Sequence, residues 1–287
     1  MIDFDALWDY GDPAGSEVRF QKALRETHDP ATKLEIQTQI ARTFSLRRQF
    51  DESHALLDEV LREGIEAFPR AQVRYLLERG RAFNSSHNKD QARPEFYAAF
   101  ELADSIGEEA LAADAAHMIA IIEPGEKSIE WNIRTIEVAK RATDPKAKKW
   151  IASAGNNLGW SYHALGRFDE ALSQFEEVAE LRKASGGDNY IIARWCVART
   201  LRSLGRYEEA LTAQVDLKKE REDLGAPSGF VFEEIGESLL ALNRTEESKP
   251  FFARAFELLS QDRWIVADEP ERLARLQLLS GGSSSVA

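Results

Sequence analysis

The chain has 287 residues, and 37 Lys or Arg against 49 Asp or Glu give it a formal net charge of −12 at pH 7. Hydrophobic residues make up 43% and charged residues 30%, which is typical of a soluble, folded protein and not of a disordered or membrane-embedded one. The excess of acid argues against a nucleic-acid-binding protein that depends on a positive field. The single cysteine, Cys196, excludes an internal disulfide framework and a multi-cysteine zinc site.

The opening residues 1–10 are acidic and lack the basic region and apolar run of a secretory signal. No stretch approaches the roughly 18 consecutive apolar residues of a membrane-spanning helix. We therefore expect a cytoplasmic protein that does not bind membranes.

A small residue, Ala or Ser, recurs along the chain at the same place in a repeated pattern. The pattern is clearest in segments 166–172 and 205–211, whose small residues Ala171 and Ala210 lie 39 positions apart. We call these small residues the anchors, and in chain order they are Ser16, Ser53, Ala92, Ser128, Ala171, Ala210 and Ser248.

Two further columns follow the register of the anchors. Nine residues before each anchor lies a large apolar residue, and twelve before it lies a column that is small at six of its seven positions: Phe4, Ala41, Gly80, Ala116, Gly159, Ala198 and Gly236. Spacings of three and four residues indicate α-helices. Each repeat is predicted to be an antiparallel hairpin, whose trailing helix carries the anchor, and neighbouring hairpins must stack to bury their apolar faces. Phe83 and Tyr162, in the large column, should be buried between helices.

The turn inside each hairpin falls five residues before the anchor. Gly11, Gly166, Gly205 and Asn243 stand there in four repeats, and these residue types suit a left-handed backbone conformation. One repeat also carries the signature Asn157-Leu158-Gly159, Tyr162, Gly166, Phe168, Ala171 and Phe175, which resembles a tetratricopeptide repeat. The resemblance extends over residues 2–258 as a long-period variant of about 39 residues, against the family's usual length of about 34.

The resemblance implies an all-α fold, a right-handed α-solenoid of about seven antiparallel helical hairpins. We expect a single solenoid domain over residues 1–267 and a C-terminal capping helix over 268–280, followed by a flexible Gly-Ser tail over 281–287. Asp268-Glu269-Pro270 starts the capping helix, which should cover the last hairpin and show its arginines to water. A partner-binding helix is the alternative for this segment.

No catalytic constellation is present in the sequence. It lacks the metalloprotease, nucleophile-elbow and phosphate-loop motifs. Asp114 and His117 share one helix face, but two ligands do not make a metal site. Cys196 is expected to be buried and unreactive. We therefore predict no enzyme activity, no cofactor and no metal.

Function should then lie on the groove that leading helices line in this family. The residues eleven before the anchors point toward it, and four of the six in the full repeats are basic: Arg42, Arg81, His117, Trp160, Arg199 and Glu237. Neighbouring columns add Asn84, His163 and Arg202. The resemblance also implies that Asn157 holds the main chain of a ligand. Arginines contact carboxylates or phosphates, and tryptophans offer flat apolar surfaces.

These residues predict a protein-protein interaction scaffold, or adaptor, whose concave groove binds an extended peptide or partner segment. The basic column favours an acidic one. Two alternatives remain: a self-assembling homo-oligomeric structural protein, and a small regulatory receptor for a signalling peptide. A structural interpretation of the basic column also remains, in which the arginines pair with Glu35, Glu78 or Asp114 of adjacent helices. The predicted partner is a protein or peptide, not a nucleic acid.

Overall fold

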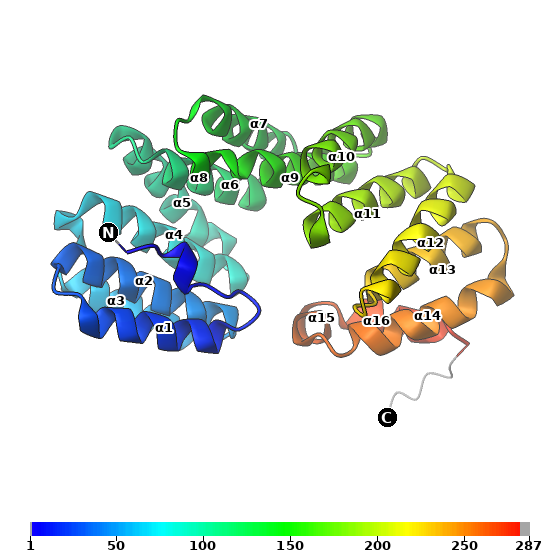
Figure 1. The fold of residues 1–287 in the computed structure, drawn as a ribbon, viewed down its shortest axis with the longest axis horizontal. Coiled ribbons are helices and arrows are strands. Elements are labelled where there is room, and N and C mark those ends of the chain that lie inside the picture. The colour runs from blue at the N-terminus through cyan, green and yellow to red at the C-terminus, as the bar shows by residue number, and fades with distance from the viewer. Residues whose placement is uncertain (1, 282–287) are drawn as a thin grey trace. The chain divides into compact units, whose positions relative to one another are not determined.

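The computed structural model describes residues 2–281, which form helices and turns without a β-strand (Figure 1). The all-α prediction is thereby confirmed. Residues 282–287 of the predicted tail lie outside the described residues. Among the helices of the described range, none combines the length and apolar content that a membrane crossing needs. Close packing divides the chain into two units, Met1–Leu158 and Gly159–Ala287.

The first unit contains four successive hairpins. A short 3₁₀ turn stands in place of the leading helix of the first hairpin, and the small elements η2 and α8 lie between hairpins. The elements are η1 (Asp5–Leu7), α1 (Pro13–Glu26), α2 (Pro30–Leu46), α3 (Phe50–Arg62), η2 (Ile65–Ala67), α4 (Pro69–Ser85), α5 (Lys89–Ser105), α6 (Glu109–Ile122), α7 (Gly125–Arg141), α8 (Pro145–Lys148) and the first part of α9 (Trp150–Ala164).

The second unit continues the same alternation of leading and trailing helices. After the end of α9 come α10 (Phe168–Lys183), α11 (Gly187–Ser203), α12 (Tyr207–Asp223), α13 (Gly229–Ala241), α14 (Thr245–Leu259), α15 (Arg263–Asp268) and α16 (Pro270–Leu279). Each anchor falls in a trailing helix, and six of the seven are almost fully buried, Ser128 being half-buried.

Several helices begin at the dipeptide Asp-Pro. The side chains of Asp12, Asp29 and Asp144 accept hydrogen bonds from backbone N–H groups of the first turn. The proline that follows has no N–H to leave unpaired, and its φ angle already suits a helix. This local chemistry fixes the starts of α1, α2 and α8.

The turn five residues before the anchor is left-handed in five hairpins. Gly166, Gly205 and Asn243 have φ of 74°, 77° and 61°, as predicted. Arg48 and His87 adopt the same conformation without being glycine. The prediction for Gly11 is wrong, because the chain enters α1 through an Asp-capped start and Gly11 has no positive φ.

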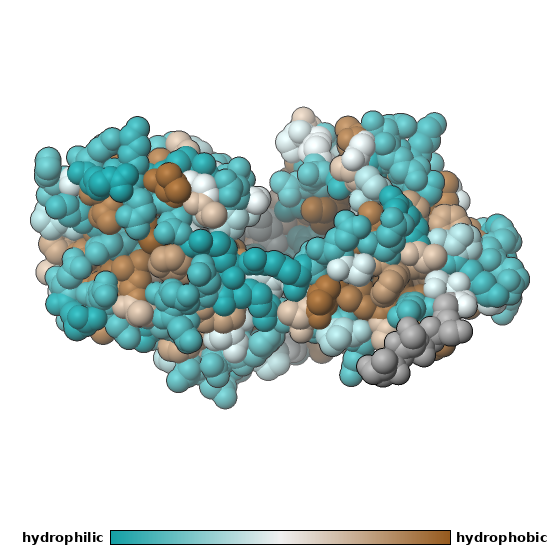
Figure 2. Space-filling model, turned by 90° about the horizontal axis from the view of Figure 1, so that it is seen from below, coloured by the Kyte–Doolittle hydropathy of each residue, from teal (hydrophilic) through white to brown (hydrophobic). Residues whose placement is uncertain are grey.

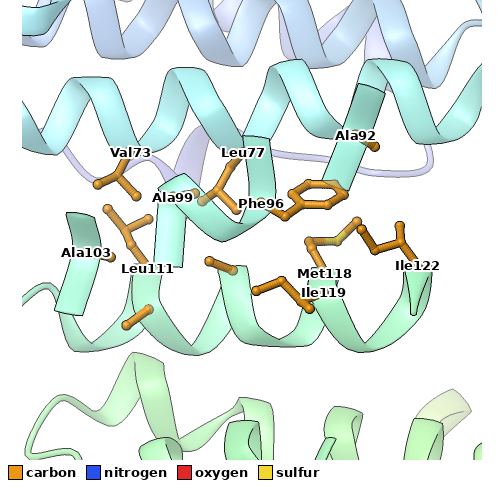
Figure 3. Close-up of a cluster of buried hydrophobic side chains, with 12 residues drawn as sticks. Val73, Leu77, Ala92, Phe96, Ala99, Ala103, Leu111, Met118, Ile119 and Ile122 are labelled. Atoms are coloured by element: carbon orange, nitrogen blue, oxygen red, sulfur yellow. The ribbon is translucent and has the colours of Figure 1, made fainter. Parts of the chain in front are cut away.

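Within a hairpin, the close approach of the two helices depends on a pair of residues. Phe96 of α5 lies directly on Gly80 of α4, and a Cβ atom added to Gly80 would lie 2.5 Å from Cε1 of the ring. The same arrangement joins Gly159 to Phe175 and Gly236 to Phe252. Phe96 also lies at the centre of the apolar cluster that α4, α5 and α6 form (Figure 3). In these three hairpins the residue twelve before the anchor is glycine because an aromatic ring covers it.

Two residues of the large column nine before the anchor are less buried than the sequence predicted. Phe83 and Tyr162 are half-buried, and each carries a guanidinium group on its ring, from Arg79 at 5.2 Å and Arg167 at 4.5 Å. Arginine side chains thus cover rings that we expected the helices to enclose.

Helix α16 lies in the segment for which we predicted a capping helix, and it packs on α14. Leu276 is fully buried there among side chains of the last hairpin. The arginines of α16 do not simply face water, because Arg272 pairs with Glu233 and Arg275 with Glu237 of α13.

On the face drawn in Figure 2, hydrophilic side chains predominate, and apolar ones form small separate patches.

Candidate functional site

A row of ion pairs joins the leading helices of the first unit. Arg42 of α2 lies 3.2 Å from Glu78 of α4, and Glu78 also lies 2.6 Å from Arg81. Arg81 also forms an ion pair with Asp114 of α6. The acids of this row neutralise the two arginines that the sequence placed on the groove, as the structural interpretation of that column proposed.

These pairs follow a rule of register. A residue eleven before the anchor of one hairpin contacts the residue fourteen before the next anchor, as in Arg81 with Asp114. The rule continues at His117, whose Nε2 lies 3.5 Å from Nδ2 of Asn157. It holds in the second unit, where Arg199 lies 2.9 Å from Glu234.

Burial and charge set the protonation of this row. The carboxylates of Asp114 and Glu78 outweigh the effect of burial and raise the pKa of Arg81, which therefore stays charged. Burial lowers the pKa of His117 to about 4; Arg81 adds to this effect and Asp114 opposes it. His117 is consequently neutral at pH 7, so it adds no positive charge to the groove.

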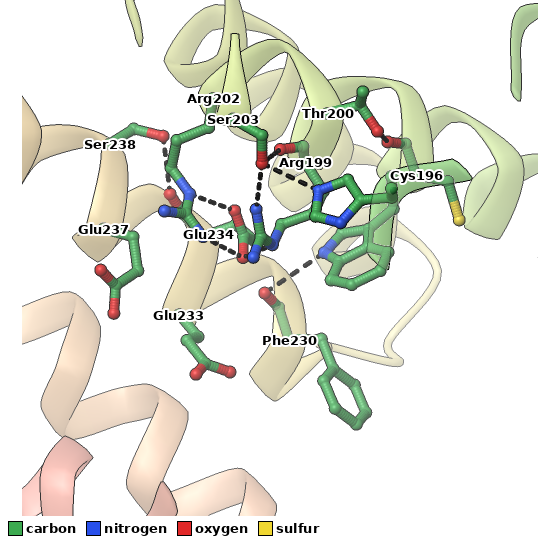
Figure 4. Close-up of polar contacts among 12 residues, drawn as sticks. Cys196, Arg199, Thr200, Arg202, Ser203, Phe230, Glu233, Glu234, Glu237 and Ser238 are labelled. Carbon is green, nitrogen blue, oxygen red and sulfur yellow. Dashed lines mark hydrogen bonds and ion pairs between the residues drawn. The ribbon is translucent and has the colours of Figure 1, made fainter. Parts of the chain in front are cut away.

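In the second unit, two arginines of α11 converge on one buried acid of α13 (Figure 4). Arg199 and Arg202 approach Glu234 to 2.9 and 2.7 Å, while Ser203 accepts a hydrogen bond from Arg199 and lies 2.8 Å from Nε2 of His163. Burial, with the two arginines adding to it, lowers the pKa of His163.

Two tryptophans of this unit, Trp160 and Trp195, pack against other aromatic rings and are not open platforms. Trp160 meets the ring of Phe175 edge-on at 5.1 Å and lies 5.9 Å from Trp195. Trp195 donates a hydrogen bond from Nε1 to the backbone oxygen of Phe230, at 3.3 Å.

The first unit has a cleft of about 440 Å³ on the side of its leading helices. We call it the unit 1 cleft. Arg42 and Arg81 line it, as do Trp150 and the acids of the ion-pair row, together with four basic residues that sequence reasoning missed: Arg70, Arg74, Lys146 and Lys149. The lysines lie on and just after α8, between two hairpins, so no repeat column could have indicated them.

The nine predicted site residues therefore fall into separate groups. Arg42 and Arg81 line the unit 1 cleft. His117 and Asn157 contact each other, and Asn84 is half-buried outside the cleft lining. Trp160, His163, Arg199 and Arg202 lie in the second unit. Ligand binding by these residues stays a prediction.

Within residues 2–281, no group of three or more His, Cys, Asp or Glu side chains is arranged to hold a metal ion. Cys196 is buried, and burial raises its pKa to about 12, so its thiol stays protonated.

Consecutive helical hairpins with small buried anchors define an α-solenoid of helical repeats. Residues 150–216 match the tetratricopeptide repeat family, and this match confirms the resemblance that the sequence carries. The segment is thus a tetratricopeptide repeat segment, within a chain whose other hairpins share the same register.

Solved structures of low sequence identity share the fold. The apo form of RapI has a TM-score of 0.70 at 10% identity, covering 97% of this chain and 80% of that one. The quorum sensor NprR from B. thuringiensis, in its apo form, has a TM-score of 0.67 at 15% identity, covering 98% and 80%. BtubC from P. vanneervenii has a TM-score of 0.61 at 16% identity, covering 78% and 93%. A comparison with curated proteins found no match.

Proposed function

We propose that this chain is a protein-interaction scaffold that binds an extended segment of a partner in the unit 1 cleft. The observation that carries the proposal is the convergence of charged and aromatic side chains from several helices on one open cleft, Arg42 and Arg81 among them. Guanidinium groups contact carboxylates by paired hydrogen bonds, and flat rings bind apolar side chains. A binding site with these groups suits a peptide that carries acid.

The likeness to NprR favours a peptide over a flat protein surface. NprR has been solved in complex with its cognate peptide NprX, with a TM-score of 0.66 to this chain at 14% identity, covering 98% of this chain and 84% of that one. This finding also supports the narrower version of the proposal, a receptor for a signalling peptide. Both versions use the same cleft.

Arg42 is the residue whose replacement tests the proposal. Glu78 keeps Arg81 as a partner when Arg42 is replaced, so Arg42→Gln leaves no buried carboxylate alone. Charge reversal at Arg81 would instead place three acids together with Glu78 and Asp114, and a loss of binding would then follow from unfolding.

The experiment selects peptides from a random displayed library against the full chain and measures their affinities by fluorescence anisotropy. Selected peptides should be acidic and should bind Arg42→Gln at least about tenfold more weakly, the loss of one charge-assisted contact. Arg62→Gln, on the exposed end of α3, is the matched control and should bind as the wild type does. The proposal fails if no peptide is selected, or if Arg42→Gln binds the selected peptides unchanged.

A further inference from the structure

The chain's own residues 2–10 form part of the wall of the unit 1 cleft, whose lining includes Phe4, Asp5 and Trp8. In Figure 1 this dark blue segment passes in front of the helices of its unit before it turns into α1. Phe4 is 8% exposed, and the guanidinium group of Arg74, from α4, lies 4.5 Å from the centre of its ring. Trp8 donates a hydrogen bond from Nε1 to Oε1 of Gln39 on α2, at 3.0 Å. We call residues 2–10 the leading segment.

The charges of the leading segment match those of the cleft. Nζ of Lys146, on α8, lies 3.3 Å from Asp3 and 3.0 Å from Asp5, although more than 140 residues of chain separate them. The two carboxylates raise the pKa of Lys146. Farther along, the rings of Trp8 and Tyr10 stack at 4.9 Å.

Arg42 completes the match. Its guanidinium group lies 5.7 Å from the ring of Trp8 and 5.5 Å from the ring of Tyr10. Three cations from three different helices, Arg42, Arg74 and Lys146, thus each face an acid or an aromatic ring of the leading segment. These are the contacts that a bound acidic, aromatic peptide would make.

The attachment is nevertheless partial, because Ile2, Leu7 and Trp8 pack only half-buried against the apolar cluster of α1 and α2 that encloses Phe4. One 3₁₀ turn, Asp5–Leu7, is the segment's only regular element, and Phe4 is its one buried side chain. The side chains of Asp3, Asp5 and Lys146 are 65%, 59% and 52% exposed, so water weakens their ion pairs. Because α2 and α4 also pack directly on each other, departure of the segment would uncover Phe20, Ile36 and Ile40 but would leave the contact of α2 with α4 in place.

We propose that the leading segment is a built-in ligand of the unit 1 cleft, and that the partner of this cleft is an acidic peptide with an aromatic residue, of the chemistry Asp-Phe-Asp, which displaces it. This inference rests on the proposed function and names its ligand class. The partner's aromatic ring takes the place of Phe4 between Phe20 and Arg74, and its acids take the place of Asp3 and Asp5 at Lys146.

Tethering makes the leading segment a strong competitor. A segment joined to its site by a short linker has an effective concentration of about 1 mM. A free peptide of the same sequence therefore binds the intact chain far more weakly than its contacts alone allow. Loosening the leading segment removes this competition and raises the affinity of the free peptide.

The test uses a fluorescent peptide with the sequence of residues 2–10 and the full chain in two forms. One is the wild type and the other, the loosened variant, carries Asp3→Asn, Phe4→Ala and Asp5→Asn. We expect the loosened variant to bind the peptide at least about tenfold more tightly than the wild type, by anisotropy. Adding Lys146→Glu should abolish this binding, whereas adding Lys148→Glu, exposed on the same helix outside the cleft lining, should not.

The inference is overturned if the folded loosened variant does not bind the peptide, if Lys146→Glu leaves binding intact, or if a scrambled peptide binds equally well. Should the loosened variant not fold by circular dichroism, Lys146→Glu in the otherwise wild-type chain gives an independent answer. Amide hydrogen exchange in residues 2–8 should then speed up at least about tenfold, while exchange in α2 and α4 stays unchanged. Unchanged exchange in residues 2–8 would contradict the proposal.

The two proposals fail separately. Library-selected peptides that bind the wild type but do not compete with the peptide of residues 2–10 leave the proposed function standing and overturn the built-in ligand. Binding of that peptide to the loosened variant, together with library peptides that bind Arg42→Gln as tightly as the wild type, supports the built-in ligand and overturns the proposed function.

Discussion

Replacing Gly80 with alanine tests how α4 and α5 approach each other. The new Cβ atom would lie 2.5 Å from Cε1 of Phe96, whereas carbon atoms in contact lie about 3.5–4.0 Å apart, so a fully buried ring must move by about 1 Å. Overpacking of this kind costs about 1–3 kcal/mol. The higher helix propensity of alanine offsets up to about 1 kcal/mol of this loss in stability. We expect a net loss of about 1–2 kcal/mol in the free energy of unfolding.

The same substitution should change sign when the ring is absent. In the Phe96→Leu background, Gly80→Ala creates the pair that Ala41 and Leu57 form in the preceding hairpin, where both are fully buried. Without the overpacking, only the higher helix propensity of alanine remains, so Gly80→Ala should raise the free energy of unfolding by up to about 1 kcal/mol. Urea unfolding followed by circular dichroism at 222 nm gives the four stabilities of this cycle.

The reasoning about the ring is refuted if Gly80→Ala is neutral or stabilising while Phe96 is present. It is equally refuted if the two substitutions are additive, because residues in contact should couple by at least about 0.5 kcal/mol. The pair Gly159 and Phe175 repeats the geometry in the second unit, with the same 2.5 Å separation, and should give the same sign reversal.

Three further predictions concern single buried side chains. Gln214 is fully buried, and neither polar atom of its side-chain amide has a hydrogen-bond partner in residues 2–281. Gln214→Leu should therefore raise the free energy of unfolding by about 1–2 kcal/mol and raise the urea midpoint. A lower midpoint would contradict this. The pKa of His117 is about 4 in the folded chain, against an ordinary value of 6.5, so the contribution of neutral His117 to the free energy of unfolding is full above pH 6.5 and is lost as the pH falls toward 4. If the free energy of unfolding has the same pH slope in the wild type and in His117→Gln, this prediction is refuted. Cys196, with a pKa of about 12, should resist thiol reagents at pH 8 until urea unfolds the chain, and rapid labelling of the native protein would show the burial to be wrong.

The helical hairpins could be predicted because their cause is local. The anchor Ala171, the apolar positions around it and the turn at Gly166 lie within a few helical turns of one another in the chain. Repetition of this pattern made the register reliable even where single residues departed from it. Gly11 shows the limit, since a glycine in the correct column still adopts an ordinary turn when an Asp-Pro helix start follows it.

The candidate site was predicted only in part. Sequence periodicity placed Arg42 and Arg81 on the inner face, and the structure puts both in the lining of the unit 1 cleft. The sequence left two roles open for these arginines, ligand binding and pairing with Glu78 or Asp114 of adjacent helices, and the structure shows that the pairs form. Glu78, Asp114 and Glu234 share the column fourteen before the anchor, but their pairing with the arginines can be recognised only when two hairpins are stacked in register.

What the sequence determined by itself is thus the helical hairpin, its anchor and its turn, because side-chain spacing and backbone preference act over a few residues. Only the tertiary structure decided which charges meet. Lys146 reaches Asp3 and Asp5 across more than 140 residues because four stacked hairpins bring α8 beside the start of the chain. Electrostatic contacts depend on distance in space and not along the chain, so no reading of spacing could have joined them.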